Sequence, residues 1–339
     1  MSSNKTNNSN NYVDTNASPS AYGWCFQVGA GITLMLDNVK EFTSMKMEGA
    51  SDDIELTLKS GKIYAQAKSI TRMGDQRSAS TNLSDALRVL STDANKGDAV
   101  RLIYITNISN PLSSKNTAFQ HGHRYEFSIL PDDAKAKIHK KVADDFPVEK
   151  FQLHILNFFG EGDNKFESVK TKISGFLREA IDDPSYNKRL LNSWFETFMV
   201  NASDKPDKEK GFDLSKKDII LPVIVLVIDT PISESDFAKV CDYDNYSEVM
   251  QGFRETINRN VCDYEFYAEV IGDFLSKRNQ AIDKNQYKYD FVKDEWKIYE
   301  EQFTAIKDVE TREAVIKLLL LTVITQRGKI DRIKGATNL

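Results

Sequence analysis

The sequence predicts an α/β domain, in which helices flank a mixed β-sheet, followed by an all-helical region. Three observations indicate this. Up to about residue 162 the spacing of the apolar residues switches between the helical and the strand period, in the order helix, hairpin, helix, strand, helix, strand. After residue 166 the period is helical. The length of 339 residues suits about two domains.

The composition is that of a globular protein, with 40% hydrophobic and 28% charged residues. A net charge of −5 does not suggest nucleic-acid binding by bulk electrostatics, so any contact with DNA must come from a local basic face or a metal. A basic face is predicted near the hairpin, where residues 56–78 contain one acid, Asp75, and five basic residues: Lys59, Lys62, Lys68, Arg72 and Arg77.

The three cysteines are scattered and form no C-x-x-C pair, which argues against a zinc site and against a disulfide framework. The N-terminus lacks a charged leader followed by an apolar run, and the longest apolar stretch, Ile219 to Ile228, is too short to cross a bilayer. We therefore expect a cytoplasmic protein without a membrane partner.

Residues 1–20 are rich in Asn and Ser and nearly without apolar side chains, so we expect a disordered tail. Ser18-Pro19-Ser20 is a helix start signal, and the apolar spacing from Trp24 to Leu36 predicts a helix packed on a sheet. Gln27 lies on this helix, where the pattern alone predicts a surface amide.

The segment from Glu48 to Lys68 predicts a β-hairpin, because apolar and polar residues alternate on both sides of Lys59 to Lys62. A two-residue turn at Ser60-Gly61 would place Asp53 opposite Lys68.

In that register Glu55 lies opposite Gln66, and opposed side chains are about 5 Å apart at Cβ. An acid, an amide and a lysine then converge on the polar face of the hairpin, an arrangement that suits a divalent metal beside a phosphate. An ordinary half-solvated hairpin with a cross-strand ion pair gives the same pattern.

Two helices and two strands complete the predicted α/β domain. They are a helix from Leu83 to Leu90, a strand from Arg101 to Thr106 that ends at Asn107, a helix after Pro131, and a strand from Phe151 to Phe158.

The second half is predicted to contain helices at 166–181, 190–200, 246–258, 264–282, 291–306 and 310–325, and one that starts at Ser233. After a charged linker, 202–213, a capping-box-like start at Ser215 precedes an apolar segment. This segment is either a helix or a buried strand, because it contains Pro222 and many β-branched residues. The predicted domains are therefore 21–165 and 166–339, the latter a partner-binding or oligomerisation module.

Other motifs are weak. His121 and His123 form the only close histidine pair and lack nearby acid or cysteine partners, so a plain loop is the better interpretation. His139 and His154 fit structural roles in a helix and a strand. There is no G-x-x-x-x-G-K-[ST] motif, and the glycines at 29 and 31 follow no strand, so neither nucleotide fingerprint is present.

Three short motifs on the predicted elements together resemble the PD-(D/E)xK nuclease superfamily. They are Trp24-Cys25-Phe26-Gln27, Glu48-Gly49-Ala50-Ser51-Asp52-Asp53-Ile54, and Ile63-Tyr64-Ala65-Gln66-Ala67-Lys68. More narrowly, residues 22–159 resemble the double-stranded-DNA endonuclease module of bacterial anti-phage effectors. These include cyclic-oligonucleotide-activated nucleases and, most similar, the LmuA nuclease subunits of Lamassu systems. The resemblance implies a restriction-endonuclease-like fold.

The resemblance also implies roles for single residues. Asp53 matches the metal-binding aspartate, Lys68 the catalytic lysine, and Gln66 stands where most of the superfamily has Glu or Asp, as is usual in this branch. Mg²⁺, or Mn²⁺, would be held by Asp53, Gln66 and the Ala67 carbonyl. The acids that could supply the missing charge are Glu48, Asp52 and Glu55, and Gln27 is a supporting residue.

The all-helical second half resembles the Lamassu-type effector. This implies assembly with an SMC-like ATPase and a small accessory subunit, suppression of the activity until foreign DNA is sensed, and a homo-oligomer in the active state. Two alternatives stay open: a catalytically silent nuclease-fold adaptor, and a nuclease activated by a cyclic oligonucleotide that binds a pocket in the helical half.

Overall fold

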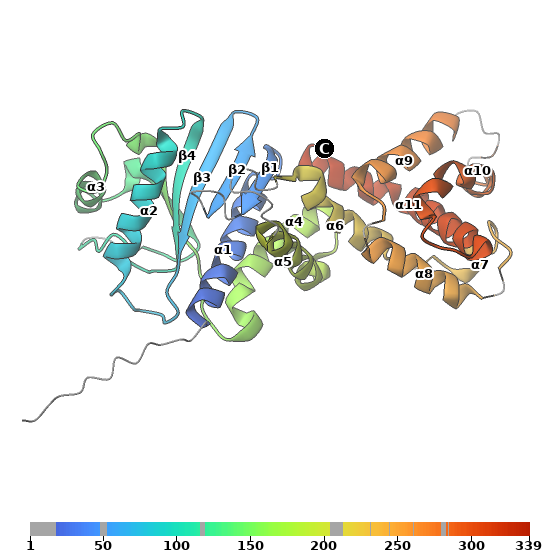
Figure 1. Ribbon diagram of the computed structural model, residues 1–339, viewed down its shortest axis with the longest axis horizontal. Coiled ribbons are helices and arrows are strands. Elements are labelled where there is room, and N and C mark those ends of the chain that lie inside the picture. The colour runs from blue at the N-terminus through green and yellow to red at the C-terminus, as the bar shows by residue number, and fades with distance from the viewer. Residues whose placement is uncertain are drawn as a thin grey trace, which may run out of the picture.

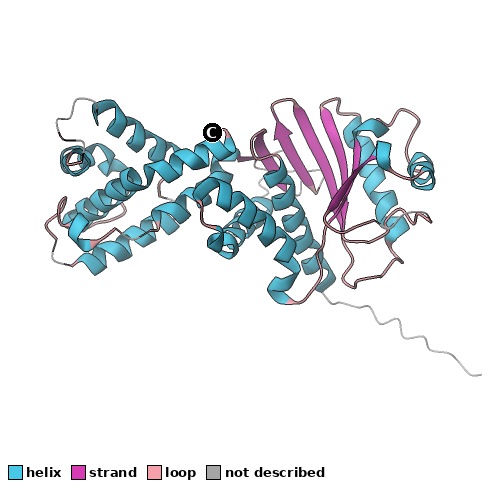
Figure 2. Ribbon diagram, turned by 180° about the vertical axis from the view of Figure 1, so that it is seen from behind, coloured by secondary structure: helices cyan, strands magenta, loops and turns pink. Residues whose placement is uncertain are grey.

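The computed structural model of the protein describes residues 18–47, 53–115, 119–203, 213–230, 232–243, 245–259, 261–278, 283 and 285–339. It is an α/β structure in which helices flank a mixed sheet, followed by a helical region, as the sequence predicts. The sheet has seven strands, of which the sequence predicts four. Figure 2 shows the strands at one end of the molecule and helices filling the other. The predicted tail lies outside the described residues up to residue 17, and the first helix begins at Ser18.

The sheet has the strand order β5-β6-β4-β3-β2-β1-β7. Strands β3, β4 and β6 are parallel, whereas every other pair is antiparallel. The strands are β1 (Phe42–Met47), β2 (Ile54–Leu58), β3 (Gly61–Lys68), β4 (Ala99–Thr106), β5 (His123–Glu126), β6 (Phe151–Ile155) and β7 (Leu214–Ser215).

The two faces of the sheet are covered by different helices (Figure 1). Helix α2 (Ala79–Ala94) packs on β3 and β4 from one side, and α1 (Ser18–Asp37) packs on β1, β2 and β3 from the other, backed by α4 (Glu167–Ile181) and α5 (Asn187–Ser203). A short helix, α3 (Asp132–His139), lies beyond α2 (Figure 1).

Alternation along the central strands divides the core in two. Ile63 and Ala65 join the core on the α1 side, and Tyr64 joins the separate core on the α2 side. The expectation of one apolar and one solvated face of the hairpin is therefore wrong, because α2 buries Tyr64 and Gln66 to 1% exposure.

The hairpin register is also shifted by two residues from the predicted one. Leu58 pairs with Gly61, so the turn is Lys59-Ser60, and Glu55 lies opposite Tyr64 rather than Gln66. The reason is Gly61, which has a φ of +136° and would place a Cβ 2.6 Å from the Asp98 carbonyl oxygen. Gly61 is needed because the segment that contains Asp98 lies close to it, and it is not part of the turn.

The second half consists of helices, and its first members pack on the sheet domain. Helices α4 and α5 contact α1, across the domain boundary predicted at residue 165, and β7 then joins the sheet. The remaining elements are α6 (Lys216–Ile228), α7 (Glu234–Phe237), α8 (Tyr246–Asn258), α9 (Tyr264–Arg278), α10 (Tyr287–Glu295), the 3₁₀ helix η5 (Trp296–Phe303) and α11 (Val309–Thr337).

The segment left open between helix and strand is the helix α6. Ser215 and Asp218 form the predicted capping box at its start, and the Trp194 indole donates a 2.7 Å hydrogen bond to the Ile219 carbonyl. Pro222 inside the helix has no N–H to donate to the Asp218 carbonyl, four residues earlier.

The longest helix, α11, runs from the distal helices to the near side of the sheet domain, where the chain ends (Figure 1). It packs against α6, α8, α9 and η5, and also against α4 beside the sheet. Near its end the Arg332 guanidinium donates to the Glu179 carbonyl at 3.3 Å, and the Asn338 amide donates to the Lys40 carbonyl at 3.2 Å. Among the described residues, no helix is long and apolar enough to cross a membrane.

His154 on β6 has the structural role that the sequence predicts. It is 4% exposed and its Nε2 lies 3.1 Å from Gln152 Oε1. Burial, with the positive charges of Arg124, Lys172 and Arg101, lowers the pKa of His154 to about 3.

We expect this histidine to make the fold sensitive to acid. Below about pH 6.5, His154 binds a proton in the unfolded chain but stays neutral in the folded protein. The free energy of unfolding therefore falls by about 1.4 kcal/mol per pH unit, until the pH reaches the pKa of His154 in the folded protein. Urea unfolding at pH 7 and pH 5 should show a loss about 2 kcal/mol smaller in His154→Gln than in the wild type. Exposed His139→Gln is the control, and an equal loss in all three proteins would contradict this role.

Candidate functional site

The candidate site lies at the carboxyl ends of the parallel strands. We call this end of the sheet the sheet edge. Lys68 at the end of β3 pairs with Thr106 at the end of β4, which in turn pairs with Ile155 at the end of β6. Asp53 precedes β2, which is antiparallel to β3, so it reaches the same edge. The carboxyl ends of parallel strands are a common place for ligand sites, because the loops that follow several strands meet there.

The structure brings the predicted aspartate and lysine together. Asp53 Oδ2 accepts hydrogen bonds from the Ala67 backbone N–H at 2.7 Å and from Lys68 Nζ at 3.2 Å. The Asp53 side chain is 12% exposed and that of Lys68 is 32% exposed. Both of these bonds go to Oδ2, and none of the residues that the structure describes donates a hydrogen bond to Asp53 Oδ1.

Gln66 and Ala67 lie between these two residues on β3. Alternation places the Gln66 side chain on the α2 side, the same side as Asp53 and Lys68, and it is 1% exposed. Ala67 is 4% exposed and faces the α1 side. The Gln66 amide is thus on the same side of the sheet as the Asp53 carboxylate, in a nearly closed environment.

Of the three acids predicted to complete a metal site, one is already paired. Glu55 forms a 2.8 Å ion pair with Lys62, whose pKa is raised chiefly by the hydrogen bond that it donates to Glu55. Glu55 also lies two residues, or about 7 Å, further along β2 than Asp53. The pairing argues against Glu55 as a ligand. Glu48 and Asp52 lie outside the described residues.

Gln27 is half-buried on α1, between the fully buried Phe26 and Val28. In the part of the chain that the structure describes, no hydrogen bond joins it to Asp53 or Lys68. Its supporting role therefore remains a prediction.

Asn107, directly after β4, fixes the backbone around the site, a role that sequence reasoning missed. Its amide oxygen accepts from the Ile70 N–H at 2.8 Å, and its amide nitrogen donates to the Ile70 carbonyl at 2.8 Å and to the Phe158 carbonyl at 3.1 Å. Tyr22 also donates to Phe158, and burial raises the pKa of Tyr22 to about 12. Asn107 thus joins the segments that leave β3, β4 and β6. An asparagine directly after an apolar strand is the only sequence signal for it.

The predicted basic face is divided between the two ends of the hairpin. Lys59 and Lys62 lie at the turn, and Lys62 is six residues, or about 20 Å, from Lys68 along β3. Arg72 and Arg77 follow Lys68 in the connection after β3, and Arg77 is bound to Asp75 at 2.7 Å. The basic charge at the site is therefore smaller than the sequence suggested.

The donor set at this edge fits a hard divalent cation in part. A carboxylate and an amide oxygen are ligands that Mg²⁺ and Mn²⁺ accept, but one carboxylate balances only half of the ionic charge. Among the described residues there is no group of three or more His, Cys, Asp or Glu that could hold a metal. A metal site would therefore need Gln66, and an acid from the neighbouring segment 48–52.

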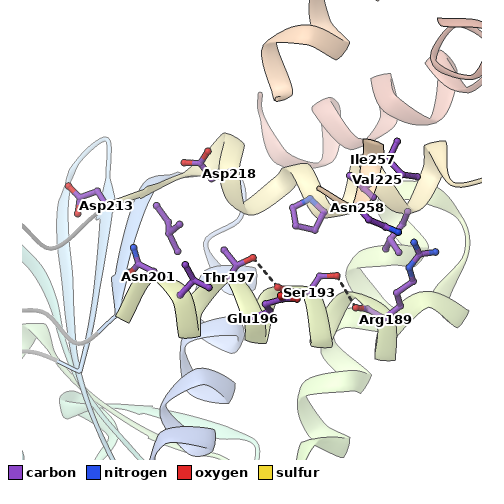
Figure 3. Close-up of a pocket in the computed structure, with 14 residues that line it drawn as sticks. Arg189, Ser193, Glu196, Thr197, Asn201, Asp213, Asp218, Val225, Ile257 and Asn258 are labelled. Carbon is purple, nitrogen blue, oxygen red and sulfur yellow. Dashed lines mark hydrogen bonds between the residues drawn. The ribbon is translucent and has the colours of Figure 1, made fainter. Parts of the chain in front are cut away.

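Cavities also lie away from this edge, and two of them bear on the alternative in which a cyclic oligonucleotide activates the protein. A cleft of about 710 Å³ between α5, α6 and α8 is shown in Figure 3. Its charged lining is mainly acidic, because it contains three acids, Glu196, Asp213 and Asp218, and one basic residue, Arg189, which is bound to Asp229 at 2.6 Å. This lining repels an anionic ligand such as a cyclic oligonucleotide.

A cavity of about 530 Å³ in the distal helices has the opposite character. Arg278, Lys288 and Arg327 line it with one acid, Asp283. This cavity suits an anion better than the acidic cleft does. It lies in the half of the chain where a nuclease activated by a cyclic oligonucleotide would need a pocket.

Comparison of the chain with family models, with curated proteins and with solved structures gives no match.

Proposed function

We propose that the protein is a metal-dependent endonuclease that hydrolyses phosphodiester bonds of double-stranded DNA, with a PD-(D/E)xK-type site. The observation that carries the proposal is the 3.2 Å contact between Asp53 Oδ2 and Lys68 Nζ, at the edge where three parallel strands end. The start of α2 is held at this edge by packing of Ala79 with Ile70 and Ile108, which brings the positive end of its dipole near the site.

Asp53 and Gln66 would hold Mg²⁺ or Mn²⁺. The ion would supply positive charge to the scissile phosphate and lower the pKa of a bound water. Lys68 has three N–H donors, one of which contacts Asp53, and the others would orient the water and stabilise the charge that develops on the phosphate. Asp53 positions the Lys68 ammonium, and the Ala67 N–H positions Asp53.

We further propose that the distal helices bind partners, as the resemblance to Lamassu effectors implies. The proposal is supported by α11, which connects those helices with the carbonyls of Lys40 and Glu179 beside the sheet. Co-purification with an SMC-like ATPase and a small accessory subunit tests this assignment.

A catalytically silent scaffold is the second candidate function, and one observation favours it. Gln66 is 1% exposed, and an ion pair between Asp53 and Lys68 can serve the fold alone. Plasmid digestion by the isolated protein with and without Mg²⁺, repeated with cyclic oligonucleotides and with the proposed partners added, separates the candidates: a scaffold cuts under none of these conditions.

Metal binding gives an independent prediction. Mn²⁺ or Mg²⁺ should raise the melting temperature of the wild type by several degrees, since an ion at 100 times its Kd adds about 2.7 kcal/mol of stability. Asp53→Ala should remove this rise. Asp98→Ala is the matched control, because Asp98 also contacts a hairpin lysine, Lys62 at 3.6 Å, but lies at the opposite end of β3. A rise that persists in Asp53→Ala would contradict the site.

A further inference from the structure

The connection between β3 and α2 begins directly after Lys68 and contains a tight turn from Arg72 to Asp75. The Asp75 N–H donates to the Arg72 carbonyl at 3.2 Å, and Gly74 has a φ of +82°, a conformation that favours glycine. Met73 therefore lies at the tip of a four-residue turn, directly beside Arg72.

The base of this turn is fixed on both sides. Upstream, both backbone groups of Ile70 are bound by Asn107 at 2.8 Å. Downstream, the Gln76 amide donates to Ser109 Oγ at 3.1 Å. A small apolar cluster of Ile70, Ala79 and Ile108, with Phe159 packed against it, fills the space between the two anchors. The turn is held against the sheet edge, so little ordering entropy is lost when its tip meets a ligand.

The tip presents an apolar side chain to solvent. Met73 is 70% exposed, more than any other large hydrophobic side chain among the described residues. A single exposed apolar residue is common, but this one is next to an exposed arginine. It is also five residues from Lys68, and so at most about 18 Å from it.

We infer that Met73 is a wedge that enters the minor groove of DNA and inserts between base pairs a few steps from the scissile phosphate, while Arg72 contacts the backbone. The inference rests on the proposed function. Proteins that bend DNA insert unbranched or bulky apolar side chains in this way, and unstacking is offset by the additional contacts that bent DNA allows. Methionine is flexible enough to fit between different base steps, so the wedge would distort DNA without reading its sequence.

The test uses Lys68→Ala protein, so that DNA stays intact, and short duplexes that contain 2-aminopurine at successive positions. We expect a rise in 2-aminopurine fluorescence on binding at one or two adjacent positions. Met73→Ala and Met73→Gln in this background should abolish the rise and weaken duplex affinity about tenfold, the value of burying one such side chain. The slope of log K against log salt should not change, because no phosphate contact is lost.

Two comparisons make the result specific. Ile129→Ala removes an apolar side chain that is 63% exposed elsewhere in the sheet domain, and it should change neither fluorescence nor affinity. Arg72→Ala should weaken binding and reduce the salt slope by about one.

The outcomes distinguish the wedge from the nuclease. If the wild type cuts plasmid but Met73→Ala and Met73→Gln behave like Ile129→Ala, the wedge is overturned and the nuclease stands. If the wild type neither binds nor cuts duplex DNA, both proposals are overturned.

Discussion

Lys68→Ala is expected to lower the rate of plasmid cleavage in Mg²⁺ by at least about 10²-fold to 10³-fold, the cost of removing one donor that stabilises developing charge. The fold should be retained, because an ion pair in which Lys68 is 32% exposed contributes less than about 1 kcal/mol. Asp53 also keeps its hydrogen bond from the Ala67 N–H. Supercoiled plasmid followed on agarose, with circular dichroism on the same samples, gives both measurements.

Lys62→Ala is the matched control for this variant. Lys62 lies on the same strand and the same side as Lys68, and it is also paired with a hairpin acid, Glu55 at 2.8 Å. It differs in lying at the turn end of β3. Cleavage at the wild-type rate by Lys68→Ala, or an equal loss in Lys62→Ala, would remove Lys68 from the mechanism.

Asn107→Ala is expected to have the largest effect on stability, a loss of about 3–5 kcal/mol in the free energy of unfolding. Asn107 is fully buried, and its removal leaves the Ile70 N–H and carbonyl without their hydrogen bonds and takes one of two from the Phe158 carbonyl. An unsatisfied buried group costs about 1–3 kcal/mol, and the three segments that Asn107 joins would also separate. Urea unfolding monitored by circular dichroism measures the loss.

Asn110→Ala provides the comparison. Asn110 lies three residues further along the same loop and also uses both ends of its amide, but both bonds go to the Ser114 backbone, four residues away. Loss of the Asn110 amide disturbs one local loop and should lower the free energy of unfolding by about 1 kcal/mol. A similar loss for the two variants would show that joining the strand ends adds no stability.

The central elements of the fold follow from the sequence because each has a periodic apolar face. Alternation identifies β2, β3 and β4, and helical spacing identifies α1, α4 and α8. The edge strands cannot be identified from apolar periodicity, because β5 is mostly exposed and β7 has only two residues. Their pairing is imposed by the neighbouring strand and not by their own residues.

Part of the candidate site was predictable and part was not. The order of Asp53, Gln66 and Lys68 along a hairpin predicts their proximity, and the shift of two residues leaves it intact because side chains repeat every second residue. The sequence could not show that Glu55 is occupied by Lys62, since this depends on the register. It also could not show the four bonds of Asn107, which come from residues 37 to 85 positions away.

The position of α11 has a consequence for synthesis on the ribosome. All seven strands have been made once Ser215 is polymerised, whereas α11, against which α6, α8, α9 and η5 pack, begins 94 residues later at Val309. At 5–20 residues per second this interval lasts about 5–20 s. During it the nascent chain carries the complete sheet edge with Asp53 and Lys68, while the distal helices lack the helix that holds them together. Any restraint that the distal helices place on the site is therefore absent from the nascent chain until α11 has been synthesised.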